Sequence, residues 1–196
     1  MAFPKTTGTS LARSHPFLGL VPLHPVDLEI PHELCPAIAD FFSLPVEIMT
    51  PRYLPLHTHN LPRQQYHATQ ILEYLLNNHS DKPLRLLGIT GVDLFIPIFT
   101  FVFGEAQLDG RSAVISTFRP GGGASLDKVP PDLLMERLLK LSIHELGHTF
   151  GLPHCRQDDC LMNFAPNLEK LDLKNLEICE YCRILLDDFF KSLSHP

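Results

Sequence analysis

The sequence has 196 residues and lacks any unbroken apolar run long enough to cross a membrane. The longest candidate, residues 86–103, is interrupted by two glycines, an aspartate and a proline, whereas a membrane-spanning helix needs about 20 apolar residues. The N-terminus also lacks a positively charged end followed by a continuous apolar stretch, so a secretion signal is not indicated. We therefore predict a cytoplasmic protein that does not associate with membranes.

Positive charge is scarce as well. The chain has 16 Lys and Arg residues against 22 Asp and Glu residues, which gives a formal net charge of -6, and it has no cluster of basic residues. This charge balance argues against nucleic acid as a partner. The hydrophobic content of 44% and the charged content of 19% are typical of a soluble globular protein, and the length suits one domain with a substantial core.

Cysteine is rare too, and the five cysteines cannot all pair with one another. Four of them lie at position 155 or later, while Cys35 stands far away. In a reducing compartment such clustering indicates metal binding and not disulfides. Cys35 aligns with Ile38 and Phe42 at helical spacing, so we expect it to pack in the core. A regulatory thiol that masks a zinc ion is the alternative for Cys35.

Hydrophobic patterning predicts a mixed α/β (α+β) layered fold, in which strands and helices alternate through the first half of the chain. The expected strands span residues 17–23, 46–49, 84–90, 99–103 and 111–118, and the expected helices begin at Pro31, run from Gln64 to Asn78, and run from Pro130 and Pro131 to about Phe150. We expect residues 1–15 to form a mobile N-terminal arm, because they lack apolar periodicity. Residues 16–196 would form a single domain, with an upper subdomain of about residues 16–151 and a small irregular C-terminal lobe of about residues 152–196.

Two further segments could suggest ligand binding, but their surroundings do not support it. The three glycines at positions 121–123 lack the Lys-Ser/Thr that a phosphate-binding loop needs, so a flexible loop is the better interpretation. His57 and His59 have no carboxylate or cysteine nearby in the sequence, which favours a solvated loop.

The most informative motif begins at His144 and continues through Glu145 and His148 to His154. On a helix, positions four apart differ by about 40° in direction, so His144 and His148 can share one Zn²⁺. Glu145 lies about 100° round, beside the metal, where it suits the role of a base better than that of a ligand. Gly151 permits a turn that brings His154 back toward the metal. Three protein ligands leave one coordination position for water.

An amphipathic helix with histidines recurring by chance is the competing interpretation of this motif. A bare His-Glu-x-x-His can arise in any helix that contains histidine. The glycine after the helix and the third histidine make a chance origin much less plausible, so we predict a catalytic zinc site.

The four clustered cysteines, Cys155, Cys160, Cys179 and Cys182, form a second candidate metal set. Four thiolates close a tetrahedron around Zn²⁺ and leave no open position, as a structural site requires. A C-x-x-C pair is also a redox motif, but redox pairs usually open a helix after a strand, whereas this pair lies in a leucine-rich tract, residues 168–186. We predict a second, structural zinc that stabilises the C-terminal lobe and fixes the segment carrying His154.

The tract from His144 to Cys155, together with Cys160-Leu161-Met162 and Cys179-x-x-Cys182, resembles the archaemetzincins, zinc metallopeptidases of the metzincin clan. The segment that runs from residues 91–94 through residues 103–106 is also similar to that family. This resemblance implies a twisted mixed sheet with packing helices, a methionine turn at Met162 near the metal, and an edge strand that borders the cleft. Our candidate for that strand is residues 111–119. No tyrosine occurs between Leu161 and Asn167, so an additional group that stabilises the oxyanion is not identified.

Two functions from different classes fit these motifs. In the first, a monomeric enzyme with two zinc ions hydrolyses peptides or proteins, and Glu145 takes a proton from zinc-activated water and passes it to the leaving amine. In the second, a zinc-stabilised module binds peptides or proteins with little or no turnover. We prefer the enzyme, because a binding module has no need of Glu145 beside an open metal position. A thiol redox protein would leave the three histidines without a purpose.

Overall fold

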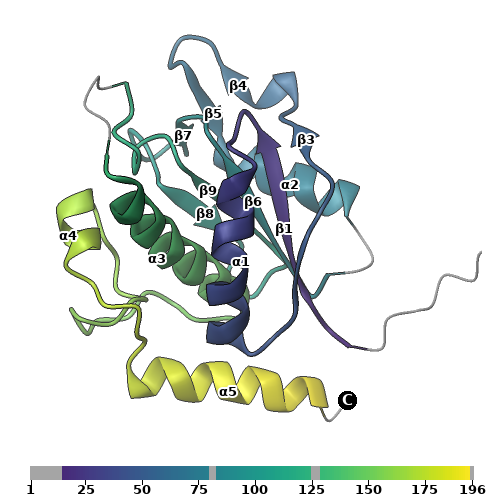
Figure 1. The fold of residues 1–196 in the computed structure, drawn as a ribbon, viewed down its shortest axis with the longest axis vertical. Helices are drawn as coiled ribbons and strands as arrows, with labels where there is room; N and C mark the ends of the chain where they lie inside the picture. Colours follow the sequence, from purple (N-terminus) through teal and green to yellow (C-terminus); the bar gives the residue numbers. More distant parts are fainter. Residues whose placement is uncertain (1–14, 80–82, 125–128, 195–196) are drawn as a thin grey trace, which may run out of the picture.

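The computed structural model describes residues 15–79, 83–124 and 129–194, which excludes most of the expected N-terminal arm. Its main element is a six-stranded sheet, shown in Figure 1, with the order β2-β1-β6-β9-β8, and with β3 also paired to β1. The strands are β1 (Leu18–His24), β2 (Val46–Ile48), β3 (Arg52–Tyr53), β6 (Arg85–Thr90), β8 (Gly104–Ala106) and β9 (Ser112–Ser116). All pairings are parallel except that of β8 with β9, which is antiparallel.

Helices cover both faces of this sheet. Helices α1 (Glu29–Phe42) and α3 (Pro131–Thr149) pack on one face, while α2 (Ala68–Asn78) packs on the other. Successive residues of a strand point to opposite faces, and alternate residues of β1 accordingly belong to different clusters. Leu18 and Leu20 pack with α1 and α3, whereas Val21 and Leu23 pack with α2. The central strands are therefore apolar on both faces, which explains their continuous hydrophobic runs.

A small three-stranded sheet lies beyond one end of the main sheet. It contains β4 (His59–Asn60), β5 (Gln65–His67) and β7 (Leu94–Phe95), and the short 3-10 helix η1 (Leu56–Thr58) precedes it. Arg119 forms two 2.7 Å hydrogen bonds with Asp93, and Gln65 donates one to the same carboxylate. Arg63 donates to the carbonyls of Phe99 and Thr100. These contacts fix the segment that follows β7.

The C-terminal segment shares the main core. Its helices are α4 (Leu168–Asp172) and α5 (Glu180–Ser194), and Figure 1 shows α5 running across one end of α1 and α3. Phe150, just after α3, contacts Phe189 and Phe190 of α5 at ring-centroid distances of 5.0 and 5.3 Å. Arg137 of α3 forms a two-pronged ion pair with Asp172 of α4, with N···O distances of 2.7 and 2.6 Å. The expected division of the domain near residue 151 stays a prediction.

Most of the expected elements are present, but four expectations were wrong. Residues 99–103 are not a strand; only Val102 makes an isolated bridge, to Leu94, and the aromatic side chains of this run line a cavity instead. The expected helix 64–78 begins only at Ala68, because residues 65–67 pair as β5. The candidate edge strand, residues 111–119, contains β9, which lies inside the sheet between β6 and β8. The expected irregular C-terminal lobe contains a 15-residue helix, α5.

None of the helices in the described part of the chain has the length and apolar character needed to cross a membrane. Cys35 is half-buried and packs against the larger core cluster, where its thiol lies 3.6 Å from the carbonyl oxygen of Val46. Its packing role is therefore confirmed. His57 is exposed and His59 is half-buried, and neither joins a group of potential metal ligands among the described residues.

Candidate active site

The C-terminal half of α3 delivers the residues of the first motif. Pro131 starts this helix, where its missing N–H is not needed for an intrahelical hydrogen bond. After Thr149 the chain turns sharply at Gly151, whose φ of 86° lies in the left-handed region that favours glycine. The Leu152 N–H then bonds the Gly147 carbonyl at 3.1 Å. This turn reverses the chain and brings His154 back beside the helix.

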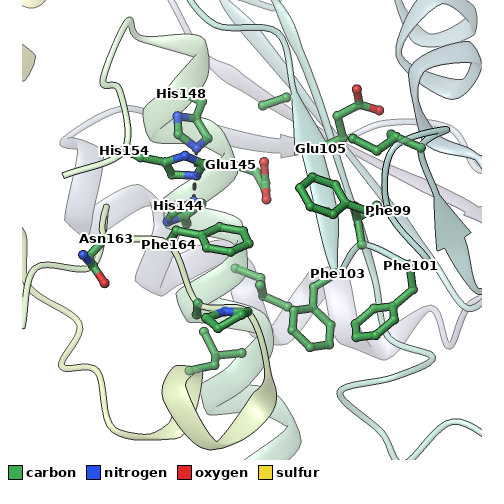
Figure 2. A pocket seen from close by; sticks show the side chains of 18 of the residues that line it. Phe99, Phe101, Phe103, Glu105, His144, Glu145, His148, His154, Asn163 and Phe164 are labelled. Atoms are coloured by element: carbon green, nitrogen blue, oxygen red, sulfur yellow. Dashed lines mark hydrogen bonds between the residues drawn. The ribbon is translucent and has the colours of Figure 1, made fainter. Parts of the chain in front are cut away.

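The three histidines converge as Figure 2 shows. One side-chain nitrogen of each lies within 4.8 Å of one from each of the others, and the Nε2 atoms of His144 and His148 are 3.1 Å apart. The Nδ1 atom of His144 lies 2.8 Å from the Leu161 carbonyl, and that of His148 lies 2.7 Å from the Leu152 carbonyl. A carbonyl can only accept, so each Nδ1 carries the proton and each Nε2 lone pair points into the cluster.

Electrostatics favour the neutral form of these rings. Burial, and then the charge of His148, lowers the pKa of His144 to about 3. Burial also lowers the pKa of His148 and His154. Neutral imidazoles with converging lone pairs are the state that a divalent metal ion requires, so the residues present fit zinc.

Glu145 lies beside the histidines and is only 7% exposed. Burial, and then the charge of Glu105, raises the pKa of Glu145 to about 8. A bound dication would counteract this rise, because an opposite charge favours the carboxylate. A Cβ at Gly104 of β8 would lie 2.8 Å from Glu145 Oε1 and 2.8 Å from its Cγ. Glycine at position 104 is therefore what lets the carboxylate approach the edge strand.

Met162 is fully buried and packs directly against α3. A Cβ at Gly147 would lie 2.7 Å from the Met162 sulfur, so this contact also depends on a glycine. The neighbouring Leu161 supplies the carbonyl that orients His144. The Met162 segment thus lies against the part of α3 that carries the histidines.

A cavity of about 370 Å³ opens next to the histidines and Glu145. Its walls are mainly apolar, and include Phe101, Phe103, Leu141, Leu161, Ala165 and Leu171. Phe99 and Phe164 approach each other at this cavity, with ring centroids 6.5 Å apart, and Phe164 also contacts the His154 ring at 5.3 Å (Figure 2). All three residues of β8 line the cavity as well. The edge strand that borders the site is therefore β8 and not residues 111–119.

The four clustered cysteines also come together. The thiol sulfurs all lie within 4.8 Å of one another, and none of them forms a disulfide. Backbone N–H groups point at two of these sulfurs: that of Cys179 at Cys160 (3.3 Å), and that of Gln157 at Cys155 (3.4 Å). Because α5 begins at Glu180, the C-x-x-C pair does open a helix, so that part of the argument against a redox pair was wrong. The convergence of four sulfurs argues for a metal more directly, since four soft donors within reach of one point suit zinc.

The sequence placed Gly104 and Glu105 only within a segment similar to the archaemetzincins, and it did not predict their contacts or those of Lys174, which all contribute to this region. Glu105 is one of the residues that line the cavity; the Thr69 hydroxyl of α2 donates to its carboxylate at 3.0 Å, and burial raises its pKa. Lys174 is only 5% exposed. Nothing in the spacing of these residues marks them, because their importance depends on contacts between distant segments.

Comparison with known proteins gives a consistent result. A family model described as Peptidase family M54 matches residues 40–188. The archaemetzincin of Methanopyrus kandleri is 41% identical over 133 residues, which cover 68% of this chain and 72% of that protein. The archaemetzincin of Archaeoglobus fulgidus is 34% identical over 150 residues, covering 76% of this chain and 86% of that protein.

Solved structures show the same similarity. The crystal structure of the Methanopyrus kandleri archaemetzincin has a TM-score of 0.78 at 32% identity, covering 92% of this chain and 99% of that one. A zinc-dependent peptidase from Methanocorpusculum labreanum has a TM-score of 0.76 at 26% identity, covering 86% of this chain and 99% of that one. The mixed α/β architecture expected from the sequence is thus confirmed. The chain belongs to peptidase family M54, the archaemetzincins, and is a zinc metallopeptidase.

Proposed function

We propose that the enzyme hydrolyses peptide bonds with Glu145 as general base and with a zinc ion held by His144, His148 and His154. The observation that carries this proposal is the convergence of three histidine nitrogens next to a buried carboxylate at the wall of an apolar cavity. A zinc ion in such a site activates water at neutral pH and stabilises negative charge that develops on a carbonyl oxygen.

Glu145 moves the proton in this scheme. One carboxylate oxygen accepts a proton from the attacking water, and the same oxygen then donates it to the departing amine nitrogen. The packing of Glu145 against Gly104 holds the carboxylate between α3 and β8, so that it needs little reorganisation before it reacts.

The substrate backbone would bind along β8. Glu105 pairs with Val114, the Ser116 N–H donates to the Phe103 carbonyl, and the Gln107 N–H donates to the Ser112 carbonyl. The odd-numbered residues around β8 therefore direct their main-chain groups toward β9. In an antiparallel pair the alternate residues, Gly104 and Ala106, then direct their main-chain groups away from β9. An extended peptide can add to this edge by hydrogen bonds and place its scissile bond near Glu145.

A second zinc ion held by Cys155, Cys160, Cys179 and Cys182 would have a structural role. The supporting observation is that four thiols enclose one point with no histidine or carboxylate among them. Met162, which lies between this cluster and α3, would then form the methionine turn. A cytoplasmic location, a monomeric state and the lack of nucleic acid and membrane partners remain predictions.

Replacing Glu145 by glutamine tests the proposal, because the amide nearly preserves shape but cannot accept the proton. We expect two zinc ions per chain in both the variant and the wild type, and a fall in peptide cleavage of about 100-fold or more for Glu145→Gln. Glu169→Gln, at an exposed position of α4, is the control and should cleave at the wild-type rate. Wild-type turnover by Glu145→Gln would refute the role of Glu145. A wild-type protein that holds two zinc ions but cleaves no member of a peptide library would instead support the binding-module alternative.

A further inference from the structure

Lys174 is a buried charge that the proposed reaction does not use. Its side chain follows α4 and enters the protein between the cysteine cluster and the active-site cavity. The ammonium group lies 3.4 Å from the Asp158 carbonyl, 3.3 Å from the Cys160 carbonyl and 3.1 Å from Asn163 Oδ1. An ammonium has three N–H donors, and three acceptors surround this one. Lys174 therefore has no donor left for a substrate, although it lies at the cavity wall.

Asn163 extends this contact toward the histidines. Its Oδ1 accepts from Lys174, and its Nδ2 donates to the Cys155 carbonyl at 2.9 Å. The Cys155 N–H in turn donates to the Met162 carbonyl at 2.9 Å. The peptide that follows His154 is thus tied on both sides to the segment 162–163, and Figure 2 shows Asn163 next to the histidine cluster.

His154 depends on such a tie more than the other two histidines do. His144 and His148 lie on α3, and a backbone carbonyl orients each of their rings. Within the part of the chain that the structure describes, the His154 ring has no comparable hydrogen bond, and its ring contacts are with His144, His148 and Phe164. His154 also lies outside any helix or strand. Its position is therefore set by how the segment 153–155 is held.

We propose that Lys174 and Asn163 are positioning residues for His154 and act through the Cys155 carbonyl. They thereby couple the cluster of four cysteines to the histidine site. Lys174 holds the carbonyl of Cys160 and at the same time fixes the Asn163 amide in the orientation that donates to Cys155. The Lys174 side chain thereby orders both the segment around Cys160 and the peptide that follows His154.

The sharpest test is Asn163→Asp, which keeps an oxygen for Lys174 but replaces the donor to Cys155 by an acceptor. We expect zinc affinity at the histidine site to fall about 10- to 100-fold, as for other groups that orient a metal ligand, and to fall by more than the affinity at the cysteine cluster. Asn167→Asp is the matched control, because Asn167 caps α4 through its Oδ1 oxygen, which aspartate retains. This control should bind both zinc ions as the wild type does.

Lys174→Met removes the charge and all three hydrogen bonds, so we expect both sites to bind zinc more weakly. Lys170→Met, at an exposed position of α4, is the control. Affinities are measured by competition with a chromophoric chelator. Cobalt(II) substitution assigns them, because thiolate-bound cobalt shows sulfur-to-metal charge-transfer absorption and histidine-bound cobalt does not.

Two results would overturn the proposal. One is wild-type affinity at the histidine site in Asn163→Asp; the other is a loss confined to the thiolate site in Lys174→Met. The inference rests on the proposed role of His154 as a zinc ligand, and the wild type tests that separately. A wild-type protein that binds zinc only at the thiolate cluster would refute the proposed function itself, whereas two zinc ions in the wild type with an unaffected Asn163→Asp would refute only this coupling.

Discussion

The contact between Gly104 and Glu145 gives a quantitative prediction for Gly104→Ala. A Cβ at position 104 would lie 2.7 Å from the Val114 carbonyl oxygen, 2.8 Å from Glu145 Cγ and 2.8 Å from its Oε1. Contacts below about 3.0 Å are essentially never made by a real Cβ, so something must shift. Val114 belongs to β9, inside the sheet, and its carbonyl cannot retreat without breaking strand pairing. The Glu145 side chain, or the edge strand β8 itself, must therefore move.

Gly104→Ala should lower the catalytic rate strongly and the stability of the fold moderately. Overpacking a buried contact destabilises a protein by about 1–3 kcal/mol. A misplacement of a reacting group by about 1 Å can lower the rate by about 100-fold. We expect Gly104→Ala to lower kcat by about that factor and to retain both zinc ions, because the three histidines are not touched. Steady-state kinetics on a validated peptide, metal analysis and thermal melting measure the three quantities.

Gly88→Ala is the matched control for this experiment. A Cβ there would lie 2.8 Å from Leu23 Cδ1 and 3.0 Å from Leu75 Cδ1, so it would crowd the flexible ends of two core side chains beside α2, away from Glu145. It should lower the melting temperature without lowering kcat. If Gly104→Ala cleaves at the wild-type rate with zinc bound, the placement of Glu145 against β8 does not matter to the reaction. The reasoning from this contact would then be wrong.

Three further predictions concern stability and metal. Asp172→Asn should destabilise the fold by about 1–2 kcal/mol near neutral pH, since it leaves the Arg137 charge without its partner. Arg137 lowers the pKa of Asp172, so the stabilisation is present above about pH 4, the unfolded value, and is lost as pH falls through the folded pKa. Denaturation of the wild type and of Asp172→Asn across this pH range should show that the difference between their unfolding free energies shrinks in acid. A difference that stays constant would contradict the role of the Asp172 carboxylate. Gly147→Ala should destabilise the protein by about 1–3 kcal/mol through the Met162 contact, and part of this loss should be recovered when Met162 is also replaced by Ala, as a double-mutant cycle would show. Stepwise chelation should abolish cleavage before it lowers the melting temperature, because zinc at the proposed histidine site would keep an open position and zinc at the proposed cysteine site would not. Simultaneous loss of cleavage and stability would argue against two distinct sites.

The parts of the site that the sequence predicted are those fixed by local geometry. Helical periodicity alone places His144, Glu145 and His148 on one side of α3, and glycine at position 151 marks the turn. The cysteine cluster could be predicted from ligand chemistry, although its members come from separate segments, because four soft donors in a short region have few other uses. In both cases the residue type itself carries the information.

The edge strand could not be identified in the same way. β8 is a three-residue strand, Gly104–Ala106, with no fully buried residue and no hydrophobic alternation. β9 is buried at all five positions and reads as a strong strand, but that burial is what places it inside the sheet. The aromatic run at residues 99–103 likewise has the composition of a strand, yet its side chains line the cavity and its backbone is held by Arg63. Composition cannot separate these cases, because it does not show which surface the side chains face.

The two glycine contacts together explain how the site is held with few hydrogen bonds to its reactive groups. On one side α3 meets β8 where Gly104 leaves room for Glu145, and on the other it meets the Met162 segment where Gly147 leaves room for the methionine. A helix packed this closely on both sides has little freedom to shift, because close-packed interiors resist changes of even one methyl group. His144 and His148 are held in place because they lie on α3, whereas His154 lies beyond the end of the helix and is not held by this packing. The third histidine is therefore the point at which the site depends on the C-terminal segment, and so on the Cys155 peptide.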